Sequence, residues 1–252
     1  MKLGIFDSGV GGLSVLKSIY EAKIFKHIIY YGDTARVPYG TKDKESIIKF
    51  SLEAVDFFQP HQIDMIIVAC NTASAYAINE MQKKTTIPII GVIEAGILAT
   101  QNKLPDKNSK ILVLATKATI HSKEYQKRLQ KIGYKNIYTI APSLFVPLVE
   151  ENIFKGEILE ATMKHYFQKV DFTPDGIILG CTHFPLISHS ISSYFHHQSL
   201  LIHSGEAILE YIKNKLPFKI YQNTQISFYA SDNVNQLKNT AKEWLKIKPD
   251  CK

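Results

Sequence analysis

Arginine is nearly absent from this chain of 252 residues, although the chain is basic. Arg36 and Arg128 are the only arginines, so the other 28 of the 30 basic residues are lysines, and the formal net charge is +7. Proteins that read nucleic acids favour the forked guanidinium group and gather it into a basic patch. Lysines such as Lys123, Lys127 and Lys131 are instead spread over predicted helix faces. We therefore interpret the positive charge as a solvated surface and expect no nucleic-acid partner.

Cysteine and long hydrophobic runs are also scarce. The chain has three cysteines, Cys70, Cys181 and Cys251, which cannot all pair, and the first two follow apolar runs typical of core strands. Unpaired cysteines of this kind argue for a reducing compartment. No stretch of 18 apolar residues occurs, and the apolar run at the N-terminus is too short for a signal peptide. We expect a cytoplasmic protein that has no membrane partner.

Two segments of the chain resemble each other and carry two of these cysteines. Asp64 precedes Cys70 by six residues, Asp175 precedes Cys181 by six residues, and a short apolar run lies inside each pair. An apolar run of this length, rich in β-branched residues, predicts a strand within a parallel sheet. Both cysteines are then expected at the carboxyl ends of their strands, where open α/β sheets bind ligands.

Strands and helices alternate along the sequence. The segments that predict strands are 2–6, 27–31, the run before Cys70, 87–92, 111–115, 136–140, 176–180, 200–203 and 226–230. Helical spacing of apolar residues predicts helices after Gly12, over 43–58, 72–83, 119–132 and 156–168, from Gly205, and through Val234, Leu237, Ala241 and Trp244. This alternation predicts an α/β fold whose mostly parallel sheet is covered on both faces.

Three pairs of segments align between the two halves of the chain with a nearly constant offset. Residues 2–8 match 110–116 at an offset of 108, Val37-Pro38 matches Val146-Pro147 at 109, and Cys70 matches Cys181 at 111. Three matches in order favour a duplicated half. We predict two pseudo-symmetric parallel-sheet α/β domains, with the active site in the cleft between them. The predicted domains are 1–92 plus 206–252 on the Cys70 side, and 93–205 on the Cys181 side.

A thiol between a strand and a helix faces unpaired N–H groups and the positive end of the helix dipole. Both stabilise the thiolate and lower the pKa of the thiol. Cys70 and Cys181 both have this sequence context, and although a buried structural cysteine is the alternative for either one, the duplication favours a chemical role for both. Cys251, at the penultimate position, is expected to take no part.

Metal and hydrolase chemistry are the alternatives at the second cysteine. Cys181 and His183 offer two metal ligands, but the sequence has no C-x-x-C pair and no second compact cluster, so we predict no metal site. In a cysteine hydrolase, His183 would activate Cys181 as the nucleophile. That interpretation stays open, although it gives no reason for a cysteine at the mirrored position Cys70.

The glycine-rich turn after the first strand is a possible anion site. Gly9, Gly11 and Gly12 follow a strand and open a helix, yet they lack the full G-x-G-x-x-G pattern, so a dinucleotide site is not favoured. Asp7 would repel a pyrophosphate but could bind an ammonium group. Small polar residues at strand ends are suited to carboxylates, with helix N-capping as the compatible alternative; these are Ser8, Asn71, Thr72, Thr116, Thr119 and Thr182.

Two acid–base thiols, carboxylate donors and one carboxylate for an ammonium group describe proton exchange at the α-carbon of an amino acid. One thiolate would remove the α-proton from one face while the other thiol delivers a proton to the opposite face. Two half-domains that face each other across a cleft would provide that opposition. The chemistry requires no cofactor, although a lysine that binds pyridoxal phosphate stays open as an alternative.

Four motifs in order make the chain similar to the bacterial glutamate racemases, and the resemblance spans nearly the whole chain. They are FDSGVGG at 6–12, YGDTARVPYG at 31–40, VACNTA at 68–73 and LGCTHFPL at 179–186. The resemblance implies two α/β halves with the active site between them. It also implies a cofactor-independent interconversion of L- and D-glutamate that supplies D-glutamate for peptidoglycan, with Cys70 acting on the D-enantiomer and Cys181 on the L-enantiomer.

The same resemblance assigns roles to further residues. It implies that Asp7 and His183 polarise the thiols and that Glu150 orients His183. The implied substrate contacts are Asp7, Ser8, Tyr39, Gly40, Asn71, Thr72, Thr182 and His183, with Thr116 and Thr119 beside them. We also expect a homodimer. The alternatives are an aspartate racemase or a related cysteine-dependent isomerase, a cysteine amidohydrolase, and a non-catalytic amino-acid-binding module.

Overall fold

Two parallel β-sheets form the framework of the protein, and a computed structural model describes residues 1–245 of it. The first sheet has the order β4-β3-β1-β2-β9 and the second has the order β6-β5-β7-β8. The strands of the first sheet are β1 (Lys2–Asp7), β2 (His27–Gly32), β3 (Met65–Val68), β4 (Ile89–Gly91) and β9 (Gln225–Ala230). Those of the second are β5 (Lys110–Ala115), β6 (Asn136–Ile140), β7 (Gly176–Gly180) and β8 (Leu200–His203). The predicted fold class is confirmed.

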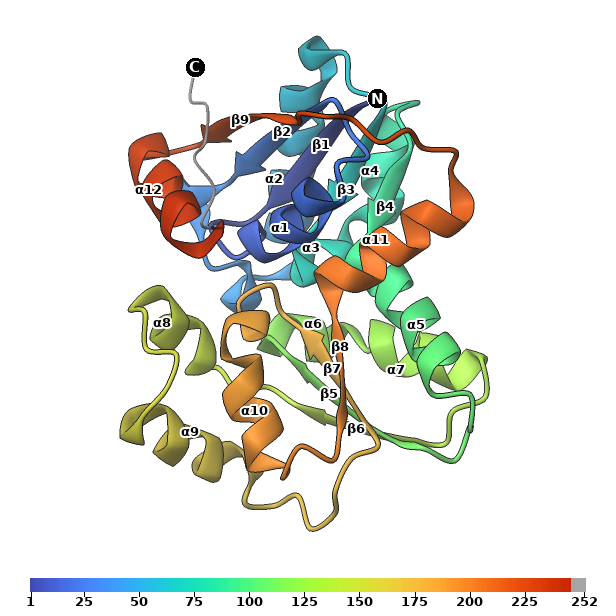
Figure 1. Cartoon of the computed structure of the whole chain (residues 1–252), viewed down its shortest axis with the longest axis vertical. Coiled ribbons are helices and arrows are strands. Elements are labelled where there is room, and N and C mark those ends of the chain that lie inside the picture. The colour runs from blue at the N-terminus through green and yellow to red at the C-terminus, as the bar shows by residue number, and fades with distance from the viewer. Residues whose placement is uncertain (246–252) are drawn as a thin grey trace.

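Helices cover the faces of both sheets (Figure 1). Those that accompany the first four strands are α1 (Leu13–Ala22), α2 (Lys44–Phe58), α3 (Asn71–Tyr76), α4 (Ile78–Lys84) and α5 (Val92–Lys103). Those that follow are α6 (Lys117–Ser122), α7 (Glu124–Lys131), α8 (Phe145–Glu150), α9 (Glu157–Phe167), α10 (Ser188–Tyr194), α11 (Ser204–Lys215) and α12 (Val234–Leu245). Short 3₁₀ helices lie at Thr34–Arg36, Tyr39–Thr41, Gln59–His61 and Phe184–Ile187.

The two sheets repeat one topology. The order β4-β3-β1-β2 in the first corresponds to β8-β7-β5-β6 in the second, and β9 is an addition beside β2. The two aspartates that precede the cysteines have equivalent roles. Asp64 accepts a hydrogen bond from the backbone N–H of Lys2 at 2.6 Å, and Asp175 accepts one from Lys110 at 2.7 Å. Each carboxylate therefore fixes the start of the neighbouring strand. The repeated aspartate thus has a structural role in both halves.

Side chains alternate between the two faces of each central strand, and the cores follow from this alternation. In β1, Leu3 and Ile5 face a core that also contains Ile111 and Val113 of β5, so that core is shared by both sheets. The other faces have separate cores. The first packs against α2, α3 and α4, and the second packs against α8, α9 and α10.

Two helices connect the sheets and pack against each other. Helix α5 leads from β4 to β5, and α11 leads from β8 back toward β9. They lie side by side at the junction between the sheets (Figure 1). The sequence did not predict α5 because it is buried around much of its circumference, and such a helix lacks a single apolar stripe. The short helix α8, which contains Pro147, was also missed.

Two predicted helices are each divided in two. The helix predicted over 72–83 is interrupted at Ala77, where α3 ends and α4 begins. The helix predicted over 119–132 is interrupted at Lys123, whose φ of 58° places it in the left-handed region. The helical spacing of apolar residues is not disturbed by one non-helical residue. The sequence pattern therefore could not show the interruptions at Ala77 and Lys123. The boundaries predicted for the two domains stay a prediction.

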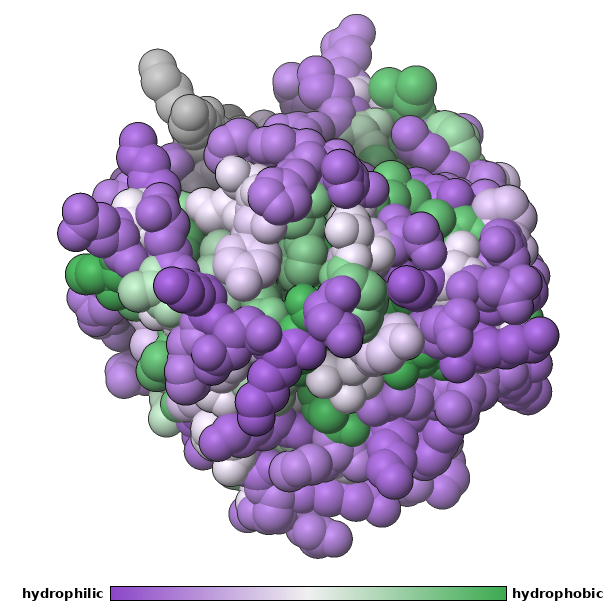
Figure 2. All heavy atoms as spheres, turned by 90° about the horizontal axis from the view of Figure 1, so that it is seen from below, coloured by the Kyte–Doolittle hydropathy of each residue, from purple (hydrophilic) through white to green (hydrophobic). Residues whose placement is uncertain are grey.

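The surface is mainly hydrophilic on the face shown in Figure 2, where hydrophobic residues form small separate patches. Large hydrophobic side chains that are exposed are far apart in the chain, such as Leu144 before α8, Ile158 in α9 and Ile220 in the loop before β9. Within the described part of the chain, no helix is both long and apolar enough to span a membrane. The polar residues of interest are therefore the buried ones, which lie in the interior near the junction of the two sheets.

Candidate active site

One small cavity at the junction of the two halves collects most of the predicted site residues. It measures about 20 Å³, which is room for one or two water molecules. Ten predicted residues line it: Ser8, Tyr39, Gly40, Cys70, Asn71, Thr72, Thr116, Cys181, Thr182 and His183. Cys70 follows β3 and Cys181 follows β7, so the carboxyl ends of equivalent strands of the two sheets present their thiols to one space.

The predicted site residues and the residues that line the cavity differ at six positions. Val37, Pro38 and Val146 line the cavity but were not predicted as site residues, although the repeated Val-Pro pair had pointed to both segments. That pair has two conformations, since Val37-Pro38 is extended with a cis peptide bond whereas Val146 lies in α8. Three predicted residues do not line the cavity: Asp7 and Thr119 are buried beside it, and Glu150 is exposed and contacts the cavity residue His183.

Cys70 is held as a neutral thiol. It is the N-cap of α3, where its sulfur accepts a hydrogen bond from the backbone N–H of Ala73 at 3.5 Å and its thiol donates to Ser8 Oγ at 3.5 Å. Burial, together with the nearby Asp7 carboxylate, raises the pKa of Cys70 to about 12. The prediction of a lowered pKa is therefore wrong for Cys70, because desolvation outweighs the start of a helix of only six residues.

Cys181 has a different environment. It precedes a 3₁₀ helix that begins at Phe184, so the predicted position at the start of an α-helix is wrong. Its sulfur lies 3.7 Å from His183 Nδ1, and His183 Nε2 lies 3.1 Å from Glu150 Oε1. Burial lowers the pKa of His183, but Cys181 and Glu150 outweigh burial and raise that pKa to about 10. His183 is therefore an imidazolium at neutral pH, and it stabilises negative charge on the adjacent sulfur.

Glu150→Gln is expected to narrow the pH range of activity on its alkaline side. Removing the Glu150 charge removes one of the two groups that raise the pKa of His183. The imidazolium is then lost at lower pH, so the alkaline limb of kcat/KM should shift downward by about one pH unit. Glu151→Gln, which changes an exposed carboxylate one residue along, is the matched control. An unchanged alkaline limb in Glu150→Gln would show that the ion pair does not govern His183.

Asp7 lies behind the cavity and is completely buried. Its carboxylate accepts hydrogen bonds from the backbone N–H of Gly9 at 2.9 Å and from Thr182 Oγ1 at 3.4 Å. Burial raises its pKa, and this outweighs the opposing effect of His183. The glycine-rich turn serves close packing here, since a Cβ on Gly12 would lie 2.5 Å from the Cβ of Asp7. Asp7 thus contacts the residues around both thiols instead of forming the cavity wall.

Side chains suited to binding a carboxylate lie at the cavity and directly beside it. The hydroxyls of Thr72, Thr116 and Thr119 form a triangle with oxygen–oxygen distances of 2.9 Å, 3.1 Å and 2.9 Å. Asn71 is nearly fully buried, and its Nδ2 has no hydrogen-bond partner among the described residues. A buried amide with unused N–H groups is suited to an anionic oxygen, because a carboxylate accepts hydrogen bonds only.

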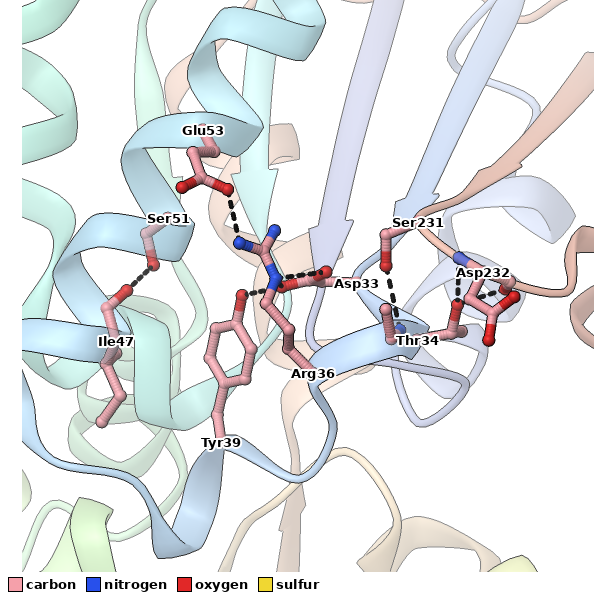
Figure 3. A network of polar contacts seen from close by, with 10 residues as sticks. Asp33, Thr34, Arg36, Tyr39, Ile47, Ser51, Glu53, Ser231 and Asp232 are labelled. Atoms are coloured by element: carbon pink, nitrogen blue, oxygen red, sulfur yellow. Dashed lines mark hydrogen bonds and ion pairs between the residues drawn. The ribbon is translucent and has the colours of Figure 1, made fainter.

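The loop that carries Tyr39 and Gly40 is fixed by a buried carboxylate (Figure 3). The Tyr39 hydroxyl donates to Asp33 Oδ2 at 2.5 Å, and Arg36 Nε lies 2.8 Å from the same carboxylate. Arg36 also pairs with Glu53 on α2. The Tyr39 hydroxyl is therefore already hydrogen-bonded to Asp33. The loop can contribute only the tyrosine ring and its backbone to the cavity.

These features define an α/β protein that has two free thiols, one at the carboxyl end of a strand in each sheet. A family model for Asp/Glu/hydantoin racemases matches residues 11–212. A glutamate racemase of Campylobacter jejuni is 58% identical over 98% of this chain and 99% of its own, and one of Helicobacter pylori strain Shi470 is 55% identical over 98% and 100%. The chain therefore belongs to the Asp/Glu/hydantoin racemase family, and within it groups with the glutamate racemases.

Solved structures agree with the sequence relatives. The crystal structure of glutamate racemase from Campylobacter jejuni superposes with a TM-score of 0.96 at 59% identity, covering 98% of this chain and 99% of that one. Glutamate racemase from Francisella tularensis in complex with D-glutamate superposes with a TM-score of 0.87 at 33% identity, covering 99% and 95%. An aspartate racemase from Picrophilus torridus has a TM-score of 0.64 at 19% identity, and this likeness shows the fold alone.

Proposed function

We propose that this protein interconverts L- and D-glutamate through two opposed thiols and without a cofactor. The observation that carries the proposal is the pair Cys70 and Cys181, which reach one small cavity from equivalent strand ends of the two halves. The similarity to glutamate racemases over nearly the full chain supports glutamate as the substrate, and one such relative was solved with D-glutamate.

The two thiols have different surroundings. The Cys181 sulfur lies 3.7 Å from His183 Nδ1, whereas burial and Asp7 raise the pKa of Cys70 and keep that thiol protonated. In the direction from L- to D-glutamate, the Cys181 thiolate takes the α-proton and Cys70 donates its proton to the opposite face. The Cys70 thiolate and the Cys181 thiol that result carry out the reverse direction. Proton exchange with solvent then returns both cysteines to their starting protonation states.

Glutamate cannot enter the cavity as it stands, because about 20 Å³ admits only water. We propose that the two halves separate to admit substrate. Two hydrogen bonds between the halves would open as substrate enters: Ser14 Oγ to the carbonyl of Thr182 at 2.7 Å, and Tyr76 to the carbonyl of Ala118 at 2.9 Å. The connecting helices α5 and α11 are the natural pivot, since the chain passes between the sheets through them.

The wider role follows from the same proposal. We propose that the protein acts in the cytoplasm as a homodimer and supplies D-glutamate for peptidoglycan synthesis. Unpaired thiols at Cys70 and Cys181 support a reducing compartment, because an oxidised pair could not exchange protons. The named relatives are bacterial, which supports the link to the cell wall.

The direct test is circular dichroism of L- and D-glutamate solutions incubated with the purified protein. The signal from either enantiomer should decay to zero after dialysis against a chelator and without added pyridoxal phosphate. Alkylation of the thiols should stop the decay. A dialysed protein that regained activity only when pyridoxal phosphate was added would contradict the thiol mechanism. Ammonia release from amide substrates without racemisation would favour an amidohydrolase.

A further inference from the structure

A buried hydrogen bond joins the two halves directly beside the candidate active site. Tyr125, on α7 of the second half, donates its hydroxyl to Oδ1 of Asn71, the first residue of α3, at 2.7 Å. Both residues are only 2% exposed. Asn71 follows Cys70 directly and lines the cavity, whereas Tyr125 does not. The sequence motifs did not point to Tyr125.

The bond determines which end of the Asn71 amide is free. The Tyr125 hydroxyl makes no other hydrogen bond within residues 1–245, so its proton requires the amide oxygen as acceptor. Burial, together with Cys181, raises the pKa of Tyr125, and the hydroxyl therefore remains a donor at working pH. With Oδ1 occupied, the unused end of Asn71 is Nδ2, which is the atom left without a partner.

Two glycines make room for the tyrosine ring. A Cβ at Gly180 would lie 3.1 Å from the ring, and a Cβ at Gly96 would lie 3.5 Å from the hydroxyl oxygen. Gly180 immediately precedes Cys181, so Tyr125 packs against the segment that carries one thiol and bonds to the residue that follows the other. The tyrosine is thus held between the two thiol-bearing segments.

We propose that Tyr125 is a positioning residue that orients the amide of Asn71, so that its Nδ2 group faces a carboxylate of the amino-acid substrate. This inference rests on the proposed function. An amide turned the other way would present its oxygen to the carboxylate, and two acceptors repel each other. It would also leave the tyrosine proton without an acceptor. The hydroxyl acts only through Asn71, at a distance from the reacting carbon.

Tyr125→Phe tests the role because it removes the hydroxyl and keeps the ring. The freed amide can rotate, so KM for both glutamate enantiomers should rise about tenfold while kcat changes less than about threefold, as expected when binding alone is weakened. Tyr134→Phe is the matched control and should leave both constants within about twofold. Tyr134 is also 2% exposed in the second half, but its hydroxyl bonds to the backbone carbonyls of Thr100 and Leu104, away from the cavity.

A double-mutant cycle separates action through Asn71 from a general structural role. When Asn71→Ala is already present, adding Tyr125→Phe should change kcat/KM by less than about twofold, because the group it positions is gone. A second tenfold loss in that background would overturn the inference, as would an unchanged KM in the single variant. Wild-type protein that racemises glutamate is required for either result to count, and failure of that assay would refute the proposed function instead.

A measurement on the wild-type protein keeps the inference testable if Tyr125→Phe does not fold. The side-chain amide signals of Asn71 in a ¹⁵N-labelled sample can be assigned by their absence from Asn71→Ala. The Nδ2 proton signals should shift when saturating D-glutamate is added, since this group approaches a carboxylate. Signals that do not move under saturation would show that the amide does not face the substrate.

Discussion

Cys70→Ala and Cys181→Ala are each expected to abolish racemisation, with a loss of at least about 10³-fold in kcat in both directions. General acid–base groups typically contribute about 10²–10⁴-fold, and the loss is at the upper end when no other group can substitute. Each thiol would serve one face of the α-carbon, so removal of either interrupts the proton path for both enantiomers. The assay is the decay of the circular-dichroism signal from each pure enantiomer.

Cys251→Ala is the matched cysteine control, and its activity is expected to equal that of the wild type. Cys251 lies outside the described residues, and the expectation comes from the sequence. The three variants should be compared at equal folded fraction, measured by thermal unfolding, because Cys70 and Cys181 are buried. Near-normal racemisation by either Cys70→Ala or Cys181→Ala would mean that one base suffices.

The second large effect is a preference for glutamate over aspartate of roughly 10⁴ in kcat/KM. The cavity region offers more donors than one α-carboxylate needs, since Asn71 Nδ2 lies together with the three-threonine triangle. Some of these donors should therefore bind the side-chain carboxylate. Aspartate is one methylene shorter, so with its α-carbon between the thiols its distal carboxylate would not reach them. Buried donors left unpaired cost about 1–3 kcal/mol each, and sites built on hydrogen bonds discriminate by roughly 10⁴.

Steady-state kinetics with both amino acids decide this preference. Values of kcat/KM within about tenfold of each other would contradict it and would favour an aspartate racemase or a broader amino-acid racemase. Thr72→Val offers an internal check, because it removes one hydroxyl of the triangle while it keeps the shape of the side chain. It should reduce the glutamate rate more than the aspartate rate, since only glutamate is expected to reach that donor.

The parts of the candidate site that follow from local sequence could be predicted from it. The strands that end at Cys70 and Cys181, and the small polar residues after them, are set by short apolar runs and helix starts, which depend on neighbours in the chain. The repeat between the halves also placed both thiols at equivalent strand ends. These features required no knowledge of tertiary contacts, and ten of the predicted residues line one cavity.

The features that were missed depend on contacts between distant segments. The raised pKa of Cys70 comes from burial and from Asp7, neither of which the motif around the cysteine shows. Tyr125 lies in a largely polar helix in which it and Leu129 are buried, and that pattern alone indicates core packing. Its bond to Asn71 spans 54 positions in sequence, so only the folded chain brings the pair together.

The central claim, proton transfer by two opposed thiols, is tested most directly by racemising D-glutamate in D₂O and analysing both enantiomers during the first turnovers. With two bases, the proton delivered to the product comes from a thiol that has exchanged with solvent. The L-glutamate formed should therefore carry deuterium at its α-carbon, while the D-glutamate that remains still carries protium. L-glutamate that retains the original α-proton would contradict the account, because a single group would then have moved that proton from one face to the other.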